Sequence, residues 1–241
     1  MNNKPTDLCG TFVHSNIHLF FAFIIHKIMR KTKAEAQQTR EALLAAALDV
    51  FYRRGVSQAS LHEIACTAGV TRGALYWHFK NKEDLFDALF QQIFQELMHQ
   101  LDNDIAAQSP DIWQNFATAI TQAFMRLVSN ESHHKFCHIL HLNCEHTEQN
   151  HNIVQLLRQY QQLWRSRLCA VFTLSLQQQK LPPDIDIDLA ALYFQSVVMG
   201  LTDLWLSNPE AIDLNSVVPR FIATSMEVLQ HSPHLRRPAV K

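Results

Sequence analysis

Two helix-start signals lie eleven residues apart in the stretch between Ser60 and Phe79, and they constrain the fold more than any other feature. Ser60 with Glu63 three residues later has the spacing of a capping box, and Thr71 is suited to begin a second short helix. Gly69 falls between them, where a left-handed backbone conformation would end the first helix. Two short helices joined by a tight, glycine-containing turn make a helix-turn-helix. Because helices this short are marginal alone, they need other helices to pack against.

The rest of the chain predicts an all-α fold. Only five glycines occur among 241 residues, and no pair of segments has the alternating pattern of a β-hairpin. Hydrophobic residues make up 47% and charged residues 18%, which is typical of a globular protein. Apolar residues recur at helical spacing in seven further segments. These segments are residues 34–54, 81–100, 109–127, 132–142, 147–179, 189–206 and 214–230.

The N-terminus differs from the rest of the chain. Residues 17–25 form an apolar run, which is too short for a bilayer that requires about twenty residues. Basic, polar sequence begins at Met29. We expect residues 1–28 to be a non-native upstream extension or a disordered tail, with Met29 as the natural start. A signal sequence or membrane anchor is the alternative.

The short helices carry residue types that bind DNA. In a helix-turn-helix the second helix lies in the major groove, with its N-terminal residues at the bases. Arg72 stands at that position and can bind guanine O6 and N7 together, while Gly73 allows close approach. A helical hairpin that only packs would leave these side chains exposed without a function. The predicted DNA contacts are Ser60, Thr71, Arg72, Gly73, Tyr76, Trp77, His78, Lys80 and Lys82.

Two stretches closely resemble the TetR family of one-component repressors: R-K-T-K-A-E-A-Q-Q-T-R from Arg30 and A-G-V-T-R-G-A-L-Y-W-H-F-K-N-K-E-D-L-F from Ala68. The AcrR-like branch, which controls multidrug efflux pumps, is nearest, and within it the Mtr-type efflux-operon repressors. That likeness extends to H-I-L-H-L-N-C-E-H-T-E-Q-N at 138–150 and L-R-R at 235–237. It implies nine helices: a three-helix DNA-binding domain at 29–80 and a six-helix ligand-binding and dimerisation domain at 81–241.

The second domain is rich enough in aromatic residues to line a large apolar pocket. Trp164 matches a pocket aromatic of the Mtr-type proteins. Polar Gln195 and apolar Met199 stand where that group has charged residues, and Asp203 is charged instead. We expect a hydrophobic or amphipathic inducer, with Asp203 favouring cations, although each aromatic residue alone could be core. The predicted ligand-binding residues are Trp113, Phe136, Trp164, Phe194, Gln195, Met199 and Asp203.

Assembly and location follow from composition. The nearly all-apolar segment 189–206 needs partners on more than one side, which with 214–230 predicts an intersubunit four-helix bundle and a homodimer. The predicted partners are double-stranded operator DNA, the inducer and a second copy of the chain, with no membrane. Five cysteines without a C-x-x-C pair favour a reducing compartment, here the cytoplasm.

The sequence gives weaker support for a metal site or an enzyme. His134, His138 and His141 share a helical face at a spacing that could hold a metal, but a partly solvated polar helix explains them as well. Ser166 and Ser175 lack a G-x-S-x-G turn, so neither is expected to be a catalytic nucleophile. We therefore predict that the chain is not an enzyme, and we predict no catalytic residue, metal or cofactor. Two functions remain: a repressor released by a ligand, and a non-inducible architectural DNA-binding dimer. An aromatic-lined cavity would favour the first.

Overall fold

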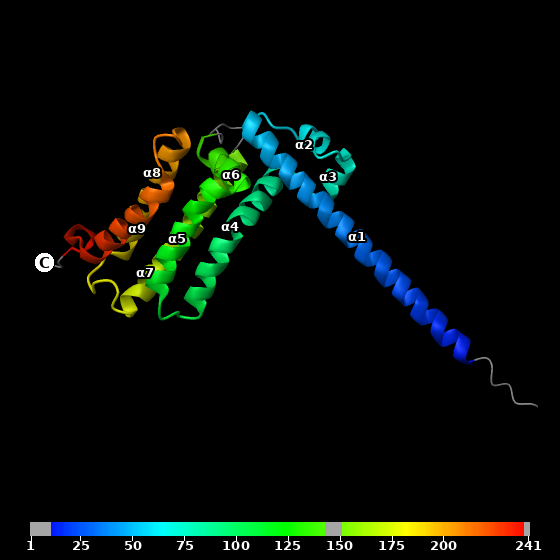
Figure 1. Ribbon diagram of the computed structural model, residues 1–241, viewed down its shortest axis with the longest axis horizontal. Coiled ribbons are helices and arrows are strands. Elements are labelled where there is room, and N and C mark those ends of the chain that lie inside the picture. The colour runs from blue at the N-terminus through cyan, green and yellow to red at the C-terminus, as the bar shows by residue number, and fades with distance from the viewer. Residues whose placement is uncertain (1–10, 143–150, 239–241) are drawn as a thin grey trace, which may run out of the picture.

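The computed structural model describes residues 11–142 and 151–238, with side chains from residue 32 onward, and this part is all-α as predicted. A first group of helices lies beside the long α1 (Thr11–Arg54), and α4 (Lys82–Ala106) leads from it into a bundle formed by the later helices (Figure 1). The helices of the described residues are α1 (Thr11–Arg54), α2 (Leu61–Thr67), α3 (Arg72–His78), α4 (Lys82–Ala106), α5 (Ile112–Ser129), α6 (Glu131–Leu142), α7 (His151–Gln177), α8 (Ile187–Ser207) and α9 (Leu214–His231).

The predicted helix boundaries around the helix-turn-helix are confirmed. The Ser60 hydroxyl oxygen accepts a hydrogen bond from the Glu63 amide at 3.1 Å and so caps α2. The Thr71 hydroxyl oxygen caps α3 in the same way, through the Ala74 amide at 3.1 Å. Gly69 has φ +68°, a conformation that costs glycine little and other residues more. These local bonds fix the turn between α2 and α3.

Two boundaries differ from the prediction. Helix α1 begins at Thr11 rather than at Ala34, since no proline or glycine interrupts residues 11–54, and its N-terminal part projects from the other helices (Figure 1). Helix α7 begins at His151, and the predicted start at Thr147 lies outside the described residues. The expectation that residues 1–28 are dispensable stays a prediction.

The chain contains two hydrophobic cores, and the predicted domain boundary at residue 80 does not separate them. The first core holds α1, α2 and α3, and also Leu85, Phe86 and Leu89 of α4. Phe136 and Ile139 of α6 are part of it as well. Ile153 of α7 also belongs to it, so the DNA-binding helices share their core with three helices of the second domain.

The second core lies among α4, α5, α7, α8 and α9. Helix α8 buries Phe194 and Trp205 in it but leaves Leu189, Leu192 and Leu204 exposed. Among the helices that the structure describes, α8 is also long and apolar enough to span a membrane by length and composition. That is weak evidence, because a helix packed on two sides within a protein assembly has the same composition.

Candidate DNA interface and ligand cavity

Helix α3 divides into a buried and an exposed side, as a recognition helix requires. Leu75 is completely buried and Phe79 is 3% exposed, and both belong to the first core. The opposite side exposes Arg72 and Tyr76, together with Trp77 at 74%. A Trp side chain normally buries most of its surface, so this degree of exposure indicates a partner. Four of the nine predicted DNA contacts, Arg72, Gly73, Tyr76 and Trp77, therefore lie exposed on α3.

The polar groups on this side are available to a ligand. The Arg72 guanidinium group and the Lys80 ammonium group make no hydrogen bond or ion pair within the described part of the chain. Ser60 and Thr71 use their hydroxyl oxygens as caps, which leaves each hydroxyl hydrogen free to donate to a phosphate. A Cβ atom at Gly73 would meet only the Thr71 side chain, at 3.8 Å. Gly73 is thus not required by packing inside the protein.

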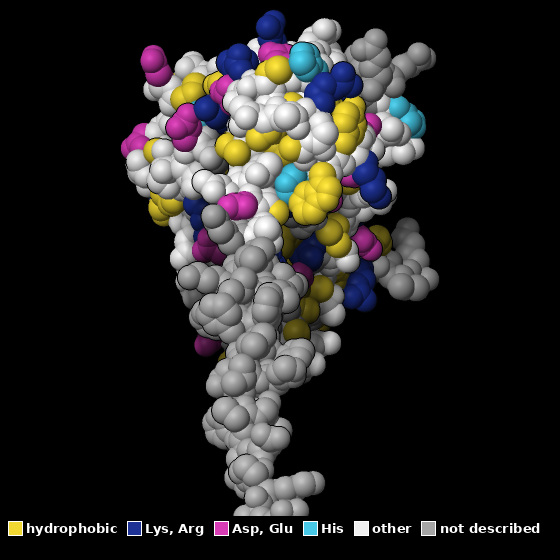
Figure 2. Space-filling model, turned by 90° about the vertical axis from the view of Figure 1, so that its right-hand side faces the viewer, with side chains coloured by type: hydrophobic (Ala, Val, Ile, Leu, Met, Phe, Trp, Pro, Cys, Tyr) yellow, Lys and Arg dark blue, Asp and Glu magenta, His cyan; other side chains and the backbone are white. Residues whose placement is uncertain are grey.

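Figure 2 views the molecule from this end, where Lys and Arg side chains are interspersed with hydrophobic and acidic ones rather than gathered in one block. The interface therefore combines separate cations with apolar contact area. His78 lies partly buried beside the Trp77 ring, with ring centroids 4.5 Å apart. Burial, and then the nearby Arg40 charge, lower the pKa of His78. A neutral His78 can form a hydrogen bond but adds little charge.

Lys82, predicted as a DNA contact, has partners within the protein. Its Nζ atom donates hydrogen bonds to the backbone oxygens of Val56 and Ser57, at 3.0 and 3.2 Å. Burial lowers the pKa of this ammonium group, an effect that the Glu83 carboxylate opposes. Lys82 therefore ties the start of α4 to the loop between α1 and α2 instead of presenting a free charge.

The sequence-based prediction missed a surface between α1 and α3. A shallow groove there is lined by Thr32, Lys33, Ala36, Thr39, Ala74, Trp77 and His78. Lys33 belongs to the basic stretch that opens the first predicted helix, which was the available signal. The groove continues the exposed side of α3 onto α1.

A cavity of about 230 Å³ lies in the second domain, between α4, α5, α6, α7 and α8. Three of the predicted ligand-binding residues line it: Trp164, Gln195 and Met199. Most other lining groups are apolar, and several are aromatic. They are Phe90, Phe94, Leu97, Met98, Ile120, Ala123, Phe124, Leu127, His133, Cys137, Leu140, His141, Leu157, Tyr160, Gln161, Val198 and Thr202.

Three other predicted ligand-binding residues, Trp113, Phe136 and Phe194, do not line this cavity. Trp113 packs against Phe172 in the second core, and Phe194 lies completely buried between Phe116 and Phe172. Phe136 is completely buried in the first core, where its ring lies near those of Phe90 and Phe94 without lining the cavity itself. Helical spacing shows which side of a helix is apolar, but not which of two apolar compartments that side faces.

Asp203 reaches the cavity only indirectly. Its carboxylate is exposed and pairs with Nδ1 of His141, whose side chain lines the cavity. The second histidine of the cavity, His133, is 5% exposed. Burial, and to a lesser extent the Arg126 charge, lower the pKa of His133 to about 4. The cavity therefore offers a neutral imidazole and a His–Asp pair rather than a free buried charge.

The residues of α4 and α6 in the cavity wall were not predicted. Phe90 and Phe94 of α4 are visible in the sequence as an i, i+4 pair, but only the pairing of α4 with α7 shows where they point.

His134, His138 and His141 form no metal-binding group with other residues in the described part of the chain.

Comparisons with known proteins match both parts of the chain to families of bacterial regulators. Residues 43–89 match the bacterial regulatory proteins of the tetR family, and residues 111–231 match the C-terminal region of the MAATS-type transcriptional repressors. The probable HTH-type transcriptional regulator ArpR of Pseudomonas putida is 32% identical over 210 residues, which cover 87% of this chain and 100% of ArpR. The HTH-type transcriptional regulator AcrR of Shigella flexneri is 32% identical, over 87% of this chain and 98% of AcrR.

Solved structures show the same fold. NalD, the secondary repressor of the MexAB-OprM multidrug efflux pump in Pseudomonas aeruginosa, is 27% identical with a TM-score of 0.70, covering 83% of this chain and 99% of NalD. The complex of SmeT with triclosan has a TM-score of 0.74 at 23% identity, covering 84% of this chain and 96% of SmeT. At that identity the likeness to SmeT concerns the fold alone.

Proposed function

Since the chain belongs to the TetR family of bacterial regulatory proteins, we propose that it represses a multidrug efflux operon until a hydrophobic compound releases it from operator DNA. Its relatives include AcrR and a probable acrEF/envCD operon repressor of Escherichia coli. The observation that carries the proposal is the pairing of an exposed recognition helix with an aromatic-lined cavity in one chain. A location in the cytoplasm, the absence of an enzymatic role and the finer likeness to Mtr-type repressors belong to the same proposal.

DNA is read mainly by α3. Arg72 binds a guanine through O6 and N7, and the exposed Tyr76 and Trp77 contact the sugar–phosphate backbone and base edges. Ser60, Thr71 and Lys80 bind phosphates, and neutral His78 adds a hydrogen bond. Lys33, in the groove between α1 and α3, adds a further phosphate contact.

A homodimer is expected to form through α8 and α9. Leu192 and Leu204 are 45% and 64% exposed on α8. An apolar helix is expected to bury such side chains, and a second copy of the chain would cover them. The dimer would present two α3 helices to half-sites one or more helical turns apart. The operator is therefore expected to be pseudo-palindromic.

The ligand is expected to be apolar, compact and neutral or cationic. The aromatic rings Phe90, Tyr160 and Trp164 can hold a cation through their π-faces, and Asp203 adds a negative charge near the cavity. His133 is neutral near pH 7 and would not repel it. A cavity of about 230 Å³ lies below the roughly 300 Å³ of typical ligand pockets, so most such ligands must move its walls.

Release of DNA follows from that displacement. The cavity wall includes Phe90 and Phe94 of α4, the helix whose first turns lie in the core of the DNA-binding helices. A ligand that binds the widened state more tightly favours a state in which the two α3 helices no longer fit successive major grooves. Each tenfold preference for that state shifts the equilibrium by about 1.4 kcal/mol.

A non-inducible architectural dimer is the alternative. It would use the same α3 helix but would have no need of an aromatic-lined cavity, so the cavity favours the inducible repressor. Titration with hydrophobic cations, followed by tryptophan fluorescence with and without operator DNA, separates the two. If operator DNA weakens the binding of the cation, the result supports the repressor. If the cation does not bind, or binds equally well with and without DNA, the result supports the architectural dimer.

A further inference from the structure

Helix α6 belongs to both functional sites. His133, Cys137 and His141 face the cavity, whereas Phe136 and Ile139 are buried in the core of the DNA-binding helices. Protein interiors are packed too closely to absorb a shift of such a helix locally. A displacement of the cavity wall at α6 is therefore transmitted to the core that holds α1.

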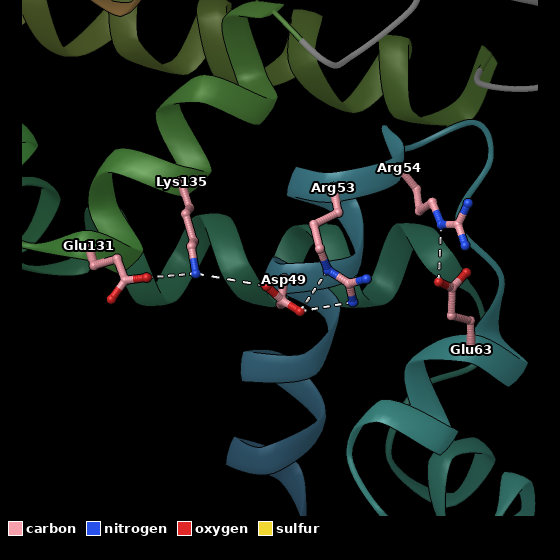
Figure 3. Close-up of polar contacts among 6 residues, drawn as sticks. All are labelled: Asp49, Arg53, Arg54, Glu63, Glu131 and Lys135. Atoms are coloured by element: carbon pink, nitrogen blue, oxygen red, sulfur yellow. Dashed lines mark hydrogen bonds and ion pairs between the residues drawn. The ribbon is translucent and has the colours of Figure 1, made fainter. Parts of the chain in front are cut away.

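The edge of α6 that faces α1 carries a row of charges. Lys135 Nζ lies 3.8 Å from an Asp49 carboxylate oxygen of α1 and 2.7 Å from Glu131 of its own helix. Asp49 also pairs with Arg53 at 2.9 Å, and these contacts lie side by side in Figure 3. Lys135 is the one member of this row that joins α6 to α1.

The row continues to the helix-turn-helix. Arg54, next to Arg53 in the last turn of α1, pairs with Glu63 of α2 at 3.4 Å (Figure 3). Lys135 also lies 5.9 Å from the centre of the Tyr52 ring, and His138 packs edge-on against the same ring. The end of α1 is thus held on one side by α6 and on the other by α2.

We propose that Lys135 is a positioning residue, whose ion pair with Asp49 fixes the angle of the DNA-binding helices relative to the ligand-binding domain. This inference rests on the proposed repressor function and names a residue that controls it. Partly exposed ion pairs contribute little, about 0.2–1 kcal/mol. A link of that strength selects one angle among close alternatives, yet a ligand can still overcome it, because allosteric coupling energies are typically about 1–3 kcal/mol.

The test uses Lys135→Met, which removes the charge but keeps the alkyl chain over Tyr52. Lys135→Arg is the conservative variant, and Glu131→Gln is the matched control that removes only the pair within α6. An operator is first selected from a randomised duplex pool with the unmodified full-length protein. Affinity is then measured for that operator and for versions with one or two base pairs inserted or removed between the half-sites.

The ratio of affinities for the selected and altered spacings is expected to fall by about 1.4- to fivefold in Lys135→Met. The same ratio should remain unchanged in Lys135→Arg and Glu131→Gln. Loss of fold stability alone would lower all affinities together and leave the ratio unchanged, so thermal unfolding is recorded alongside. An unchanged ratio in Lys135→Met would overturn the inference while leaving the repressor function intact. Failure of the unmodified protein to select any duplex would overturn both.

Discussion

The rings of Tyr160 on α7 and Phe90 on α4 lie face to face, with centroids 3.5 Å apart and planes 2° from parallel. The Tyr160 hydroxyl also donates a hydrogen bond to the Asp87 carboxylate, one turn closer to the DNA-binding helices. Burial, and then this hydrogen bond, raise the pKa of Tyr160, so the hydroxyl remains a neutral donor. Both rings line the cavity. A ligand that parts them therefore acts on the contact that holds α4 against α7.

Tyr160→Phe is expected to keep the ring stack and to lose the bond to Asp87. Hydrogen bonds to charged groups contribute about 1.5–3 kcal/mol, so the free energy of unfolding should fall by about that amount. Tyr193→Phe, at a partly buried tyrosine of α8 whose hydroxyl makes no such bond to a residue that the structure describes, is the matched control. Urea unfolding of the three proteins measures the difference. Equal stability of Tyr160→Phe and the unmodified protein would show that the contact does not hold α4.

Arg72→Ala is expected to abolish the preference for operator over random duplex. A bidentate contact to guanine accounts for about 1–3 kcal/mol of discrimination, or roughly five- to 150-fold in the affinity ratio. Arg165→Ala removes an equal charge far from α3, at a residue that pairs with Asp188. Fluorescence anisotropy with labelled operator and random duplexes provides both affinities. A preserved ratio in Arg72→Ala would mean that α3 does not read the bases.

The sequence was sufficient to predict the local structure of the helix-turn-helix but not the cavity. Caps at Ser60 and Thr71 and the turn at Gly69 depend on residues close in the chain, so local patterns predicted them correctly. Arg72 and Trp77 are exposed because α3 is short and has only one buried side. The internal hydrogen bonds of Lys82 were not predicted, because its partners, 25 and 26 residues away, cannot be inferred from spacing.

The cavity depends on how distant helices pair. Phe136 and Cys137 are adjacent in the chain, yet one enters the core of the DNA-binding helices and the other lines the cavity. Both are apolar and buried, so composition cannot separate them. Trp164 was predicted through a family resemblance, whereas His141 became apparent only from its pairing with Asp203 across α6 and α8.

Leu204→Glu is expected to convert the dimer to a monomer. Leu204 is 64% exposed on α8, and a carboxylate there would be buried without a partner in the proposed four-helix bundle. Val128→Glu, at a residue 50% exposed on α5, is the matched control and should remain dimeric. Sedimentation at micromolar concentration distinguishes the two states. A Leu204→Glu dimer would place the subunit interface elsewhere.

Acid is expected to destabilise the protein through His133. Because burial lowers the pKa of His133 from 6.5 to about 4, the unfolded chain binds its proton first as the pH falls. This group therefore leaves the free energy of unfolding unchanged above pH 6.5. Between pH 6.5 and 4 it lowers that free energy by up to about 3 kcal/mol. His133→Gln should flatten that part of the pH profile of unfolding, with His62→Gln as an exposed control. An equally steep profile in His133→Gln would show that His133 is not held neutral.

Reciprocal titration of ligand and operator tests the inducible-repressor account most directly. Operator affinity is measured at increasing concentrations of a hydrophobic cation such as rhodamine 6G, a detergent and a bile-salt-like anion, and the affinity of each compound is measured with and without operator. The account predicts that at least one compound, with the cation favoured by Asp203, weakens operator binding by about five- to 150-fold. Operator must then weaken binding of that compound by the same factor, because the coupling is reciprocal. Operator affinity that stays constant while the compounds bind, or no binding of any compound, would contradict the account.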